Sequence, residues 1–498
     1  MNAKKQVWIV GSGLAALATA LRLAKRGYQV DILEKNTTPG GRLNQIKKNG
    51  FTFDTGPSFF SMSYEFKEFA NDCGIELPFR FHPVDPLYTV HFEDNDQPFE
   101  LHRNLAKLAS QFQKYEPDFD QKMSRYLRDT GSLFHDTMDI VVRQNFDSLP
   151  DYIEKLSHVD KKHLPTLIAN FQHVVSRYFK SEEARQILSL VAYFLGNPPN
   201  QTNGVYSLLS YTEFMHDGYH YVEGGMYEIV KGLVRELEKA GVNIHYNHQV
   251  TDVVKNGNKI TAVVDQNGNH FEGDIFVVNS DSALFRGEVL KRKEFSSKKL
   301  ARKEWSMGMF TMYVGLNCKI DNIGLHSYYI GKDPKKNKMD RFDHPVIPEH
   351  PYYYVNAASR FNPQSAPEGC EALMFVVPVP NLLHKKEWND KEAIADHLLE
   401  DFSKRLGVEI MPHVTTRIIY SPENWRDNFN LYMGAALGLS HTMKQTGALR
   451  PANKDEMFIN LFYTGSSTVP GIGLPMTIIS SRLTTERIIG EPITPVYR

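Results

Sequence analysis

The sequence contains little cysteine and no excess of charge of either sign. Only Cys73, Cys318 and Cys370 occur among its 498 residues, and no two of them form a CxxC pair. We therefore expect neither a disulfide framework nor a metal site, and a reducing compartment fits this composition. Lys and Arg number 57 and Asp and Glu 58, giving a formal net charge of -1, which argues against a nucleic-acid-binding protein.

Long apolar runs are absent as well. The first six residues lead directly into an expected strand and lack the apolar centre of a signal peptide. Every longer apolar stretch is interrupted by charged residues or proline, so we expect no bilayer-spanning helix. The length and the hydrophobic content of 41% nevertheless suffice for about two or three domains with a large buried core.

The N-terminal part has the pattern of a βαβ unit. An apolar run at residues 6–10 predicts a strand, and apolar residues at helical spacing predict a helix over residues 14–26, which Gly27 is placed to end. A second strand is expected at residues 29–33, directly before Glu34. The sequence therefore predicts an α/β fold that starts with a parallel pair of strands.

The turn between the first strand and the helix carries a G-x-G-x-x-A motif. Gly11 permits a tight turn, Gly13 lets the backbone approach a pyrophosphate on the helix N-terminus, and Ala16 lets the helix pack close to the strand. Glu34 follows Gly13 by 21 residues and is placed to bind ribose hydroxyls, which disfavours the 2'-phosphate of NADP. The candidate cofactor contacts in this region are Gly11, Gly13, Leu14, Ala15, Ala16, Glu34 and Lys35.

The pattern becomes helical and then strand-rich further along the chain. Helices with mixed apolar and charged faces are expected at residues 101–115, 119–142 and 181–194, which predicts an inserted helical domain. A helix is expected at 226–240, and strands are expected at 242–246, 249–255, 259–265, 269–272, 309–315, 327–330, 352–356 and 372–379.

Two further glycine-containing segments carry a resemblance to known flavoproteins. They read Pro39-Gly40-Gly41-Arg42 and Gly50-Phe51-Thr52-Phe53-Asp54-Thr55-Gly56-Pro57-Ser58. Paired glycines allow backbone contact with a cofactor, and Arg42 offers a fork of donors to phosphate or ribose oxygens. The pattern resembles the amine oxidase and phytoene desaturase superfamily. This resemblance implies FAD, with Gly41 and Arg42 beside the pyrophosphate and Thr55, Gly56, Pro57 and Ser58 near the flavin ring.

The C-terminal segment at residues 461–476 looks like the closing signature of carotenoid desaturases, a strand followed by a Gly-Pro-rich turn and a helix expected from Thr477. Such a turn can present backbone amides to the flavin, and the helix N-terminus adds a positive dipole. The resemblance also implies that the backbone of Val250 meets the adenine. The further candidate cofactor contacts are Val250, Gly465, Ser466, Gly473, Leu474, Pro475 and Met476.

Internal segments extend the resemblance over nearly the whole chain. Residues 192–198, 205–208, 221–226, 365–369 and 377–380 occur in the same order in bacterial phytoene and dehydrosqualene desaturases, and the sequence looks closest to 1'-hydroxycarotenoid 3,4-desaturases. The resemblance implies an FAD-dependent oxidoreductase of carotenoid biosynthesis that forms a C=C bond by hydride transfer to flavin N5. A phytoene or dehydrosqualene desaturase, a terminal carotenoid oxygenase, an amine or porphyrinogen oxidase and a prenyl-lipid-binding escort protein stay open as alternatives.

The return of strand patterns after the helical region indicates that the domains interleave along the chain. A Rossmann-like FAD-binding domain would comprise residues 1–75, 216–285 and 456–498. A mixed-sheet substrate domain would comprise residues 76–100 and 286–455, and a helical insertion facing the membrane would comprise residues 101–215.

Few catalytic side chains are required if the polyene stabilises the developing cation and the protein mainly positions one bond. We take His216 and Asp217 as candidate catalytic residues. The other polar groups expected near the substrate tunnel are Glu213, His220, His326 and His441. Aromatic residues that can line a polyene channel or serve as ordinary core are Phe59, Phe60, Tyr219 and Tyr221.

An apolar substrate requires access from a bilayer. Amphipathic helices at residues 101–215 can lie in its interface, and the eight basic residues at 286–303 can face anionic lipid or form a solvated helix face. We therefore expect a cytoplasmic protein bound peripherally to the inner face of the cell membrane, with no nucleic-acid partner. The implied substrate is a carotenoid, and the electron acceptor is oxygen or a quinone.

Overall fold

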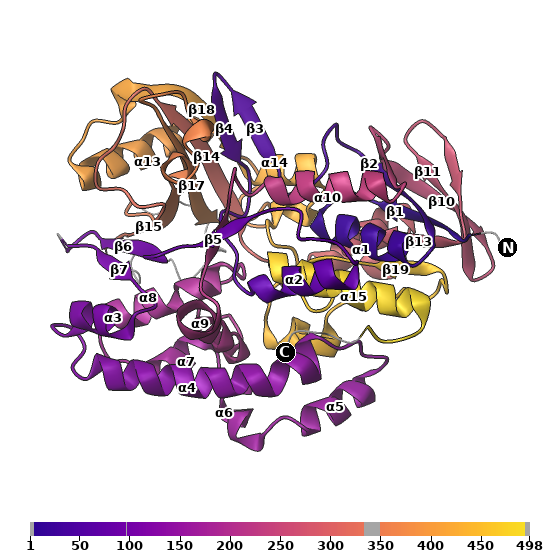
Figure 1. Ribbon diagram of the computed structural model, residues 1–498, viewed down its shortest axis with the longest axis horizontal. Coiled ribbons are helices and arrows are strands. Elements are labelled where there is room, and N and C mark those ends of the chain that lie inside the picture. Colours follow the sequence, from indigo (N-terminus) through magenta and orange to yellow (C-terminus); the bar gives the residue numbers. More distant parts are fainter. Residues whose placement is uncertain (1–3, 96, 333–348, 494–498) are drawn as a thin grey trace.

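The computed structural model describes residues 4–95, 97–332 and 349–493, and a five-stranded parallel sheet organises its N- and C-terminal parts (Figure 1). The strand order is β19 (Leu461–Tyr463), β13 (Ile275–Val278), β1 (Gln6–Val10), β2 (Gln29–Glu34) and β9 (Asn243–Tyr246). The strands that form this sheet therefore come from three distant parts of the chain.

Both faces of this sheet are covered, as is usual for parallel strands. On one face Val7 and Ile9 share a core with three helices, α1 (Leu14–Lys25), α10 (Glu228–Lys239) and α15 (Leu474–Ile489). On the other face Val10 packs against a small antiparallel sheet made of β10 (Val250–Asn256), β11 (Lys259–Asp265) and β12 (His270–Glu272).

A second, seven-stranded sheet lies beside the first (Figure 1). Its neighbouring strands are antiparallel except β15 and β6, which run parallel. The strand order is β18 (Val414–Tyr420), β14 (Gly308–Leu316), β17 (Glu371–Val379), β16 (Tyr353–Asn356), β15 (His326–Ile330), β6 (Tyr88–Phe92) and β7 (Phe99–Leu101). Helix α13 (Lys391–Leu406) covers one face, where Phe375 packs against Phe402.

The other face of the seven-stranded sheet meets a layer of helices that runs along the lower edge of Figure 1. Tyr328 and Met374 of the sheet share a core there with Phe112 and Leu188 of the helices. The helices are α3 (Leu105–Phe112), α4 (Phe119–Thr137), α5 (Leu149–Ser157), α6 (Leu164–Leu167), α7 (Phe171–Ser176), α8 (Glu182–Tyr193) and α9 (Leu208–Tyr211).

Shorter elements connect these layers. Strand β3 (Gln45–Lys48) pairs with β4 (Phe51–Asp54), and β5 (Phe81–Pro83) pairs with β8 (His220–Val222). The remaining helices are α2 (Ser63–Asp72), α11 (Ser282–Leu284), α12 (Ser297–Leu300) and α14 (Pro422–Phe429).

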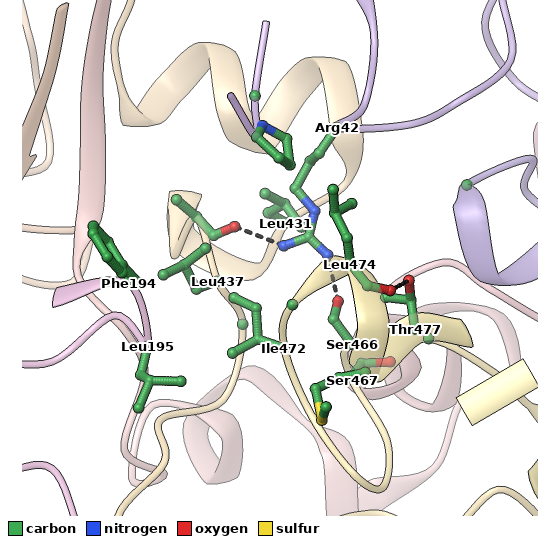
Figure 2. Close-up of a pocket in the computed structure, with 18 of the residues that line it drawn as sticks. Arg42, Phe194, Leu195, Leu431, Leu437, Ser466, Ser467, Ile472, Leu474 and Thr477 are labelled. Atoms are coloured by element: carbon green, nitrogen blue, oxygen red, sulfur yellow. Dashed lines mark hydrogen bonds between the residues drawn. The ribbon is translucent and has the colours of Figure 1, made fainter. Parts of the chain in front are cut away.

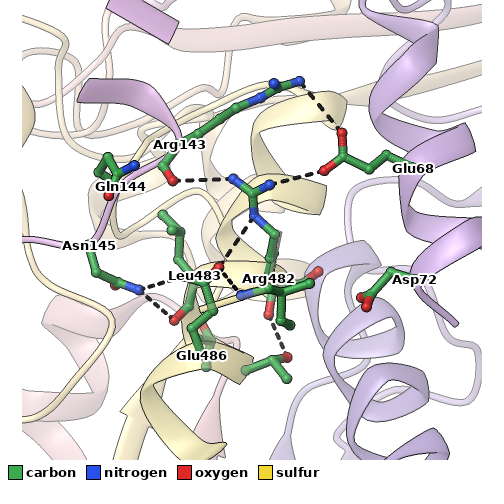
Figure 3. Close-up of polar contacts among 12 residues, drawn as sticks. Glu68, Asp72, Arg143, Gln144, Asn145, Arg482, Leu483 and Glu486 are labelled. Carbon is green, nitrogen blue, oxygen red and sulfur yellow. Dashed lines mark hydrogen bonds and ion pairs between the residues drawn. The ribbon is translucent and has the colours of Figure 1, made fainter. Parts of the chain in front are cut away.

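A buried ion cluster ties the helical layer to the parallel sheet (Figure 3). Arg482 of α15 pairs with Glu68 of α2 at 3.0 Å and donates to the carbonyl oxygen of Arg143 at 3.2 Å. Asn145 then donates to the carbonyl oxygen of Leu483 at 3.0 Å. Because Arg143 and Asn145 precede α5, these contacts fix the start of the outer helices against α15.

The predicted α/β core, mixed sheet and helical insertion are confirmed, and two predicted boundaries need correction. Leu101 ends strand β7, so the helix expected from residue 101 begins at Leu105, where the Asn104 side chain caps it. The last helix begins at Leu474 rather than at Thr477. Within the described ranges no helix has both the length and the apolar character that crossing a bilayer demands. The domain limits and a membrane-facing role of the helical layer stay predictions.

Candidate active site

The turn after β1 forms a cradle that leaves no room for side chains. Gly11 has a φ of +91°, and its N–H donates to the carbonyl oxygen of Leu33 at 2.7 Å. A Cβ atom on Gly13 would lie 2.4 Å from Oδ1 of Asn279. Ala16 is fully buried and packs α1 onto the sheet, so it supports the cradle without lining it.

Glu34 lies at the carboxyl end of β2, beside this cradle. Its Oε2 atom accepts hydrogen bonds from the backbone N–H and the hydroxyl of Ser12 at 2.9 and 2.6 Å. The Lys35 Nζ atom donates to the carbonyl oxygen of Asp427 and to Oδ1 of Asn430, both at 2.7 Å. Lys35 thus ties the C-terminal end of α14 to the residues that follow β2, a role that the sequence did not indicate.

Arg42 lies between the cradle and the C-terminal turn (Figure 2). Its guanidinium donates to the carbonyl oxygen of Ala436 at 2.7 Å and to the hydroxyl of Ser466. Burial lowers the pKa of Arg42, while Asp281 opposes that shift. No carboxylate of the described residues lies within ion-pair distance of Arg42. A half-buried cation without a paired anion favours a ligand that carries negative charge.

The C-terminal turn closes the cradle from the other side. Gly465 has a φ of +103°, and a Cβ atom there would lie 2.6 Å from Nδ2 of Asn279. Gly473, with a φ of +117°, precedes Leu474 and Pro475 at the N-terminus of α15, where free N–H groups attract anions. Figure 2 shows Ser466, Ile472 and Leu474 around the guanidinium of Arg42. Ser466, Gly473, Leu474, Pro475 and Met476 all line the same cavity.

The segment after β4 supplies a further wall. A Cβ atom on Gly56 would lie 2.2 Å from the carbonyl oxygen of Arg42, and the Ser58 hydroxyl lies 2.6 Å from the Tyr354 hydroxyl. Asp54 accepts hydrogen bonds from the N–H groups of Met226 and Tyr227 at the start of α10, and burial raises its pKa to about 6. Of the predicted cofactor residues, the cavity lining includes Gly11, Gly13, Leu14, Ala15, Glu34, Lys35, Gly41, Arg42, Thr55, Gly56, Pro57, Ser58, Val250, Gly465, Ser466, Gly473, Leu474, Pro475 and Met476.

One continuous cavity of about 1210 Å³ begins at this cradle. It is larger than the roughly 300–1,000 Å³ of most small-molecule pockets. Beyond the cradle its walls become apolar and reach Tyr152 and Leu156 of α5, Leu190 of α8 and Ile330 of β15. The cavity therefore has room for a dinucleotide at the cradle and for an extended apolar molecule beyond it.

The candidate catalytic pair does not line this cavity. Asp217 instead accepts hydrogen bonds from the N–H and the hydroxyl of Ser63 at 2.6 and 2.9 Å, and so stabilises the start of α2. The ring of His216 packs between Tyr64 and Tyr211. These contacts give both residues structural roles outside the cavity lining. A catalytic role for His216 and Asp217 stays a prediction.

The other polar and aromatic candidates divide between wall and core. Phe59, Phe60, Tyr219 and His441 line the cavity, whereas Glu213, His220, Tyr221 and His326 lie behind its wall. In the basic segment Arg286 and Arg292 are bound to Glu456, so only the other six basic residues can face solvent or lipid.

Sequence reasoning missed Asn279, which contacts the cradle directly. Its Nδ2 atom donates to the carbonyl oxygen of Thr464 at 3.0 Å, so it links the turns after β13 and β19. The available signal was its place directly after a buried apolar strand, since ligands of parallel sheets bind at the carboxyl ends of strands.

Comparisons with known proteins agree with this geometry. A profile of the flavin-containing amine oxidoreductases matches residues 14–489. A zeta-carotene-forming phytoene desaturase from Myxococcus xanthus is 31% identical, over 97% of this chain and 94% of the relative. A carotenoid 3,4-desaturase from Haloarcula japonica is 30% identical, over 98% of both chains. Among solved structures, a putrescine oxidase with bound putrescine shares the fold, with a TM-score of 0.62 and 13% identity over 98% of this chain and 100% of that chain.

FAD is the cofactor that this family shares, and the unpaired Arg42, the cradle glycines and the helix N-termini of α1 and α15 fit its pyrophosphate. Membership of a flavin-containing family also excludes the alternative of an escort protein that binds prenyl lipid without flavin chemistry. The chain therefore belongs to the flavin-containing amine oxidoreductases and, within them, to the FAD-dependent carotenoid desaturases.

Proposed function

We propose that this oxidoreductase introduces a C=C bond into a carotenoid and that its reaction is the 3,4-desaturation of a 1'-hydroxycarotenoid. The observation that carries the proposal is the continuity of the cavity, which leads from the dinucleotide cradle into an apolar space beyond it. The 3,4-position is supported by resemblance to 3,4-desaturases and by the relative from Haloarcula japonica.

FAD, when bound, would supply the acceptor at flavin N5 for a hydride taken from a carbon next to a double bond, and the neighbouring carbon would lose a proton so that the C=C bond forms. The residues of the chain have other tasks. Arg42 and the N-terminus of α15 place positive charge beside the cofactor. The apolar walls, such as Leu190 and Ile330, exclude water and hold one C–C bond of the polyene in position. The electrons then pass to oxygen or to a membrane quinone.

The test is anaerobic mixing of the purified holoenzyme with carotenoids in liposomes. We expect loss of the oxidised-flavin absorbance and a product lighter by two hydrogens. A panel with a 1'-hydroxycarotenoid, phytoene and dehydrosqualene identifies the preferred substrate and bond. Preference for phytoene or dehydrosqualene would contradict 3,4-desaturation, and a product that gains oxygen would indicate the terminal oxygenase. Reoxidation by air or by a quinone then identifies the acceptor.

We also propose that the protein binds peripherally to the inner face of the cell membrane through α5 and α6. In α5 the side chains of Tyr152 and Leu156 line the cavity, whereas Leu149 and Ile153 are at least half exposed. Leu164 of α6 and the following Ile168 are exposed to the same degree. Exposed apolar residues on helices beside a cavity for an apolar substrate suit insertion into a bilayer interface.

Co-sedimentation with lipid vesicles tests this surface. Replacement of Leu149, Ile153, Leu164 and Ile168 by serine should reduce vesicle binding strongly without changing the flavin content. The matched control replaces Met457 and Ile459, which are equally exposed but lie beside β19. Equal vesicle binding by the two variants would contradict the proposed surface.

A further inference from the structure

Two buried oxygen atoms beside the cavity lack hydrogen-bond partners. Tyr328 of β15 lines the cavity and is 6% exposed, and its hydroxyl has no partner among the residues that the structure describes. Glu213 is 3% exposed, and within the same residues its Oε1 atom is also without a partner. Native proteins rarely leave such groups unpaired, so each one calls for an explanation.

These two residues belong to one cluster. The hydroxyls of Tyr88 and Tyr219 lie near the carboxyl group of Glu213 and partly offset the rise of its pKa on burial. The ring of Tyr88 lies 5.1 Å from that of Tyr328 and 6.3 Å from that of Tyr219. We call Tyr88, Glu213, Tyr219 and Tyr328 the phenol cluster. Tyr219 and Tyr328 form the cavity wall, and Glu213 lies behind them.

Both apolar rings and a further phenol surround the phenol cluster. The ring of Phe59 lies 4.3 Å from that of Tyr219, and the ring of Phe194 lies 5.9 Å from that of Tyr328. Tyr354 is also close, but its hydroxyl already lies 2.6 Å from both the Ser58 hydroxyl and Nδ1 of His326. Unlike the Tyr354 hydroxyl, the Tyr328 hydroxyl therefore has no partner among the described residues.

The charge state of the cluster limits what it can bind. Burial raises the pKa of Glu213 to about 8, so the carboxyl is mainly neutral at pH 7. A neutral cluster does not favour a cationic ligand such as an amine. It suits a hydroxyl or carbonyl oxygen, which can donate to or accept from a phenol.

We propose that the phenol cluster is a specificity subsite for a hydroxyl or carbonyl oxygen at one end of the carotenoid. Tyr328 contacts that oxygen directly, and Glu213 is a positioning residue that orients Tyr219. The inference rests on the proposed carotenoid desaturation. A carotenoid with a hydrocarbon end in this place leaves the buried phenol of Tyr328 without a hydrogen-bond partner. Enzymes discriminate strongly against a substrate analogue that lacks the hydroxyl which such a buried group binds.

The experiment compares kcat/KM for a hydroxycarotenoid and for the hydrocarbon of the same skeleton, both in liposomes, in the wild type and in Tyr328→Phe. We expect the wild type to prefer the hydroxycarotenoid by about tenfold or more. Tyr328→Phe should lose about tenfold in kcat/KM for the hydroxycarotenoid, mainly through KM, and change little with the hydrocarbon. Glu213→Gln should lower the same ratio by a smaller factor.

Tyr221→Phe is the matched control. The Tyr221 hydroxyl is also buried without a partner within the described ranges, but Tyr221 does not line the cavity, and its ring packs against Phe361. This variant should keep the wild-type substrate ratio. Flavin content and melting temperature show whether each variant is folded.

The outcomes separate the two proposals. If the wild type desaturates neither compound, the proposed function fails. If it desaturates both with equal kcat/KM, or if Tyr328→Phe keeps the preference of the wild type, desaturation stands and the subsite is wrong, with water as the partner of the phenol.

Discussion

Individual residues of the cradle control whether the cofactor binds. Gly13 is the N-cap of α1 and has a φ of -66°, which any residue can adopt. A larger residue is therefore excluded by the close contact with Asn279 and not by backbone strain. In Gly13→Val the new side chain meets Asn279 and occupies the path of the pyrophosphate, so we expect loss of bound FAD. The measurement is the ratio of flavin to protein absorbance after purification. Gly324→Ala is the control, because its Cβ atom would meet nothing closer than 3.7 Å. Normal flavin content in Gly13→Val would contradict this placement.

Glu213 makes stability depend on pH. Its folded pKa is about 8 against an ordinary value of 4.5, so above about pH 4.5 the unfolded chain releases a proton that the folded chain keeps. The stabilisation that the protonated Glu213 carboxyl gives the folded state is therefore fully present below pH 4.5 and is lost as the pH rises through 8. Relative to Glu213→Gln, the wild type should lose up to about 1.4 kcal/mol of unfolding free energy for each pH unit in this window.

Urea unfolding of both proteins at pH 5 and pH 8 provides the measurement. The exposed Glu368 serves as the control site, and Glu368→Gln should keep a constant difference from the wild type. A difference between Glu213→Gln and the wild type that also stays constant with pH would show that the carboxyl is already ionised.

Motif residues of the site could be predicted from sequence, and isolated polar residues could not. Gly13 and Arg42 lie in segments whose spacing reflects one local turn, so the sequence contains their geometry. His216 and Asp217 have no such local constraint. Their surroundings depend on packing against Ser63 and Tyr64, which are distant in sequence, and for that reason the sequence did not show that they lie outside the cavity lining. Their catalytic role stays a prediction.

At the scale of elements, local patterns predicted those strands and helices whose apolar residues recur clearly at strand or helix spacing. The strand at Gln6–Val10 and the strand at Lys259–Asp265 have the expected limits. The parallel pairing of β15 with β6 could not be predicted, because it joins residues that lie 238 positions apart, as Ser327 and Thr89 do. The helix expected from residue 101 began too early, since Leu101 has the same apolar character in a strand as in a helix.

The junction between α2 and α15 should be sensitive to loss of charge. Arg482 is 3% exposed and pairs with Glu68 at 3.0 Å (Figure 3). Arg482→Met leaves the Glu68 carboxylate buried without the ion pair to Arg482, so we expect a loss of about 3–5 kcal/mol in unfolding free energy. Lys239→Met is the control, because Lys239 pairs with Glu236 at the surface and should contribute less than about 1 kcal/mol. Equal losses in urea unfolding would contradict a structural role of the cluster.

The whole molecule is assembled from segments that alternate along the chain. The parallel sheet takes β1 and β2 from the beginning of the sequence, β9 and β13 from the middle and β19 from the end. The recurrence of strand patterns indicated interleaving, but strand order follows from non-local pairing and cannot be obtained from periodicity. One consequence is that the cofactor cradle joins all three regions, through Glu34, Val250 and Ser466.

FAD should therefore stabilise the molecule as a whole. A ligand that binds only the folded state adds about 2.7 kcal/mol when its free concentration is 100 times Kd. We expect the apoprotein to melt at a lower temperature than the holoenzyme, and added FAD to raise the melting temperature in a concentration-dependent way. FMN lacks the adenosine half that would contact Glu34 and Val250, so it should give a smaller shift. Gly13→Val should show no shift with either flavin. An equal shift with FMN and FAD would mean that the segments carrying Glu34 and Val250 do not contribute to cofactor binding.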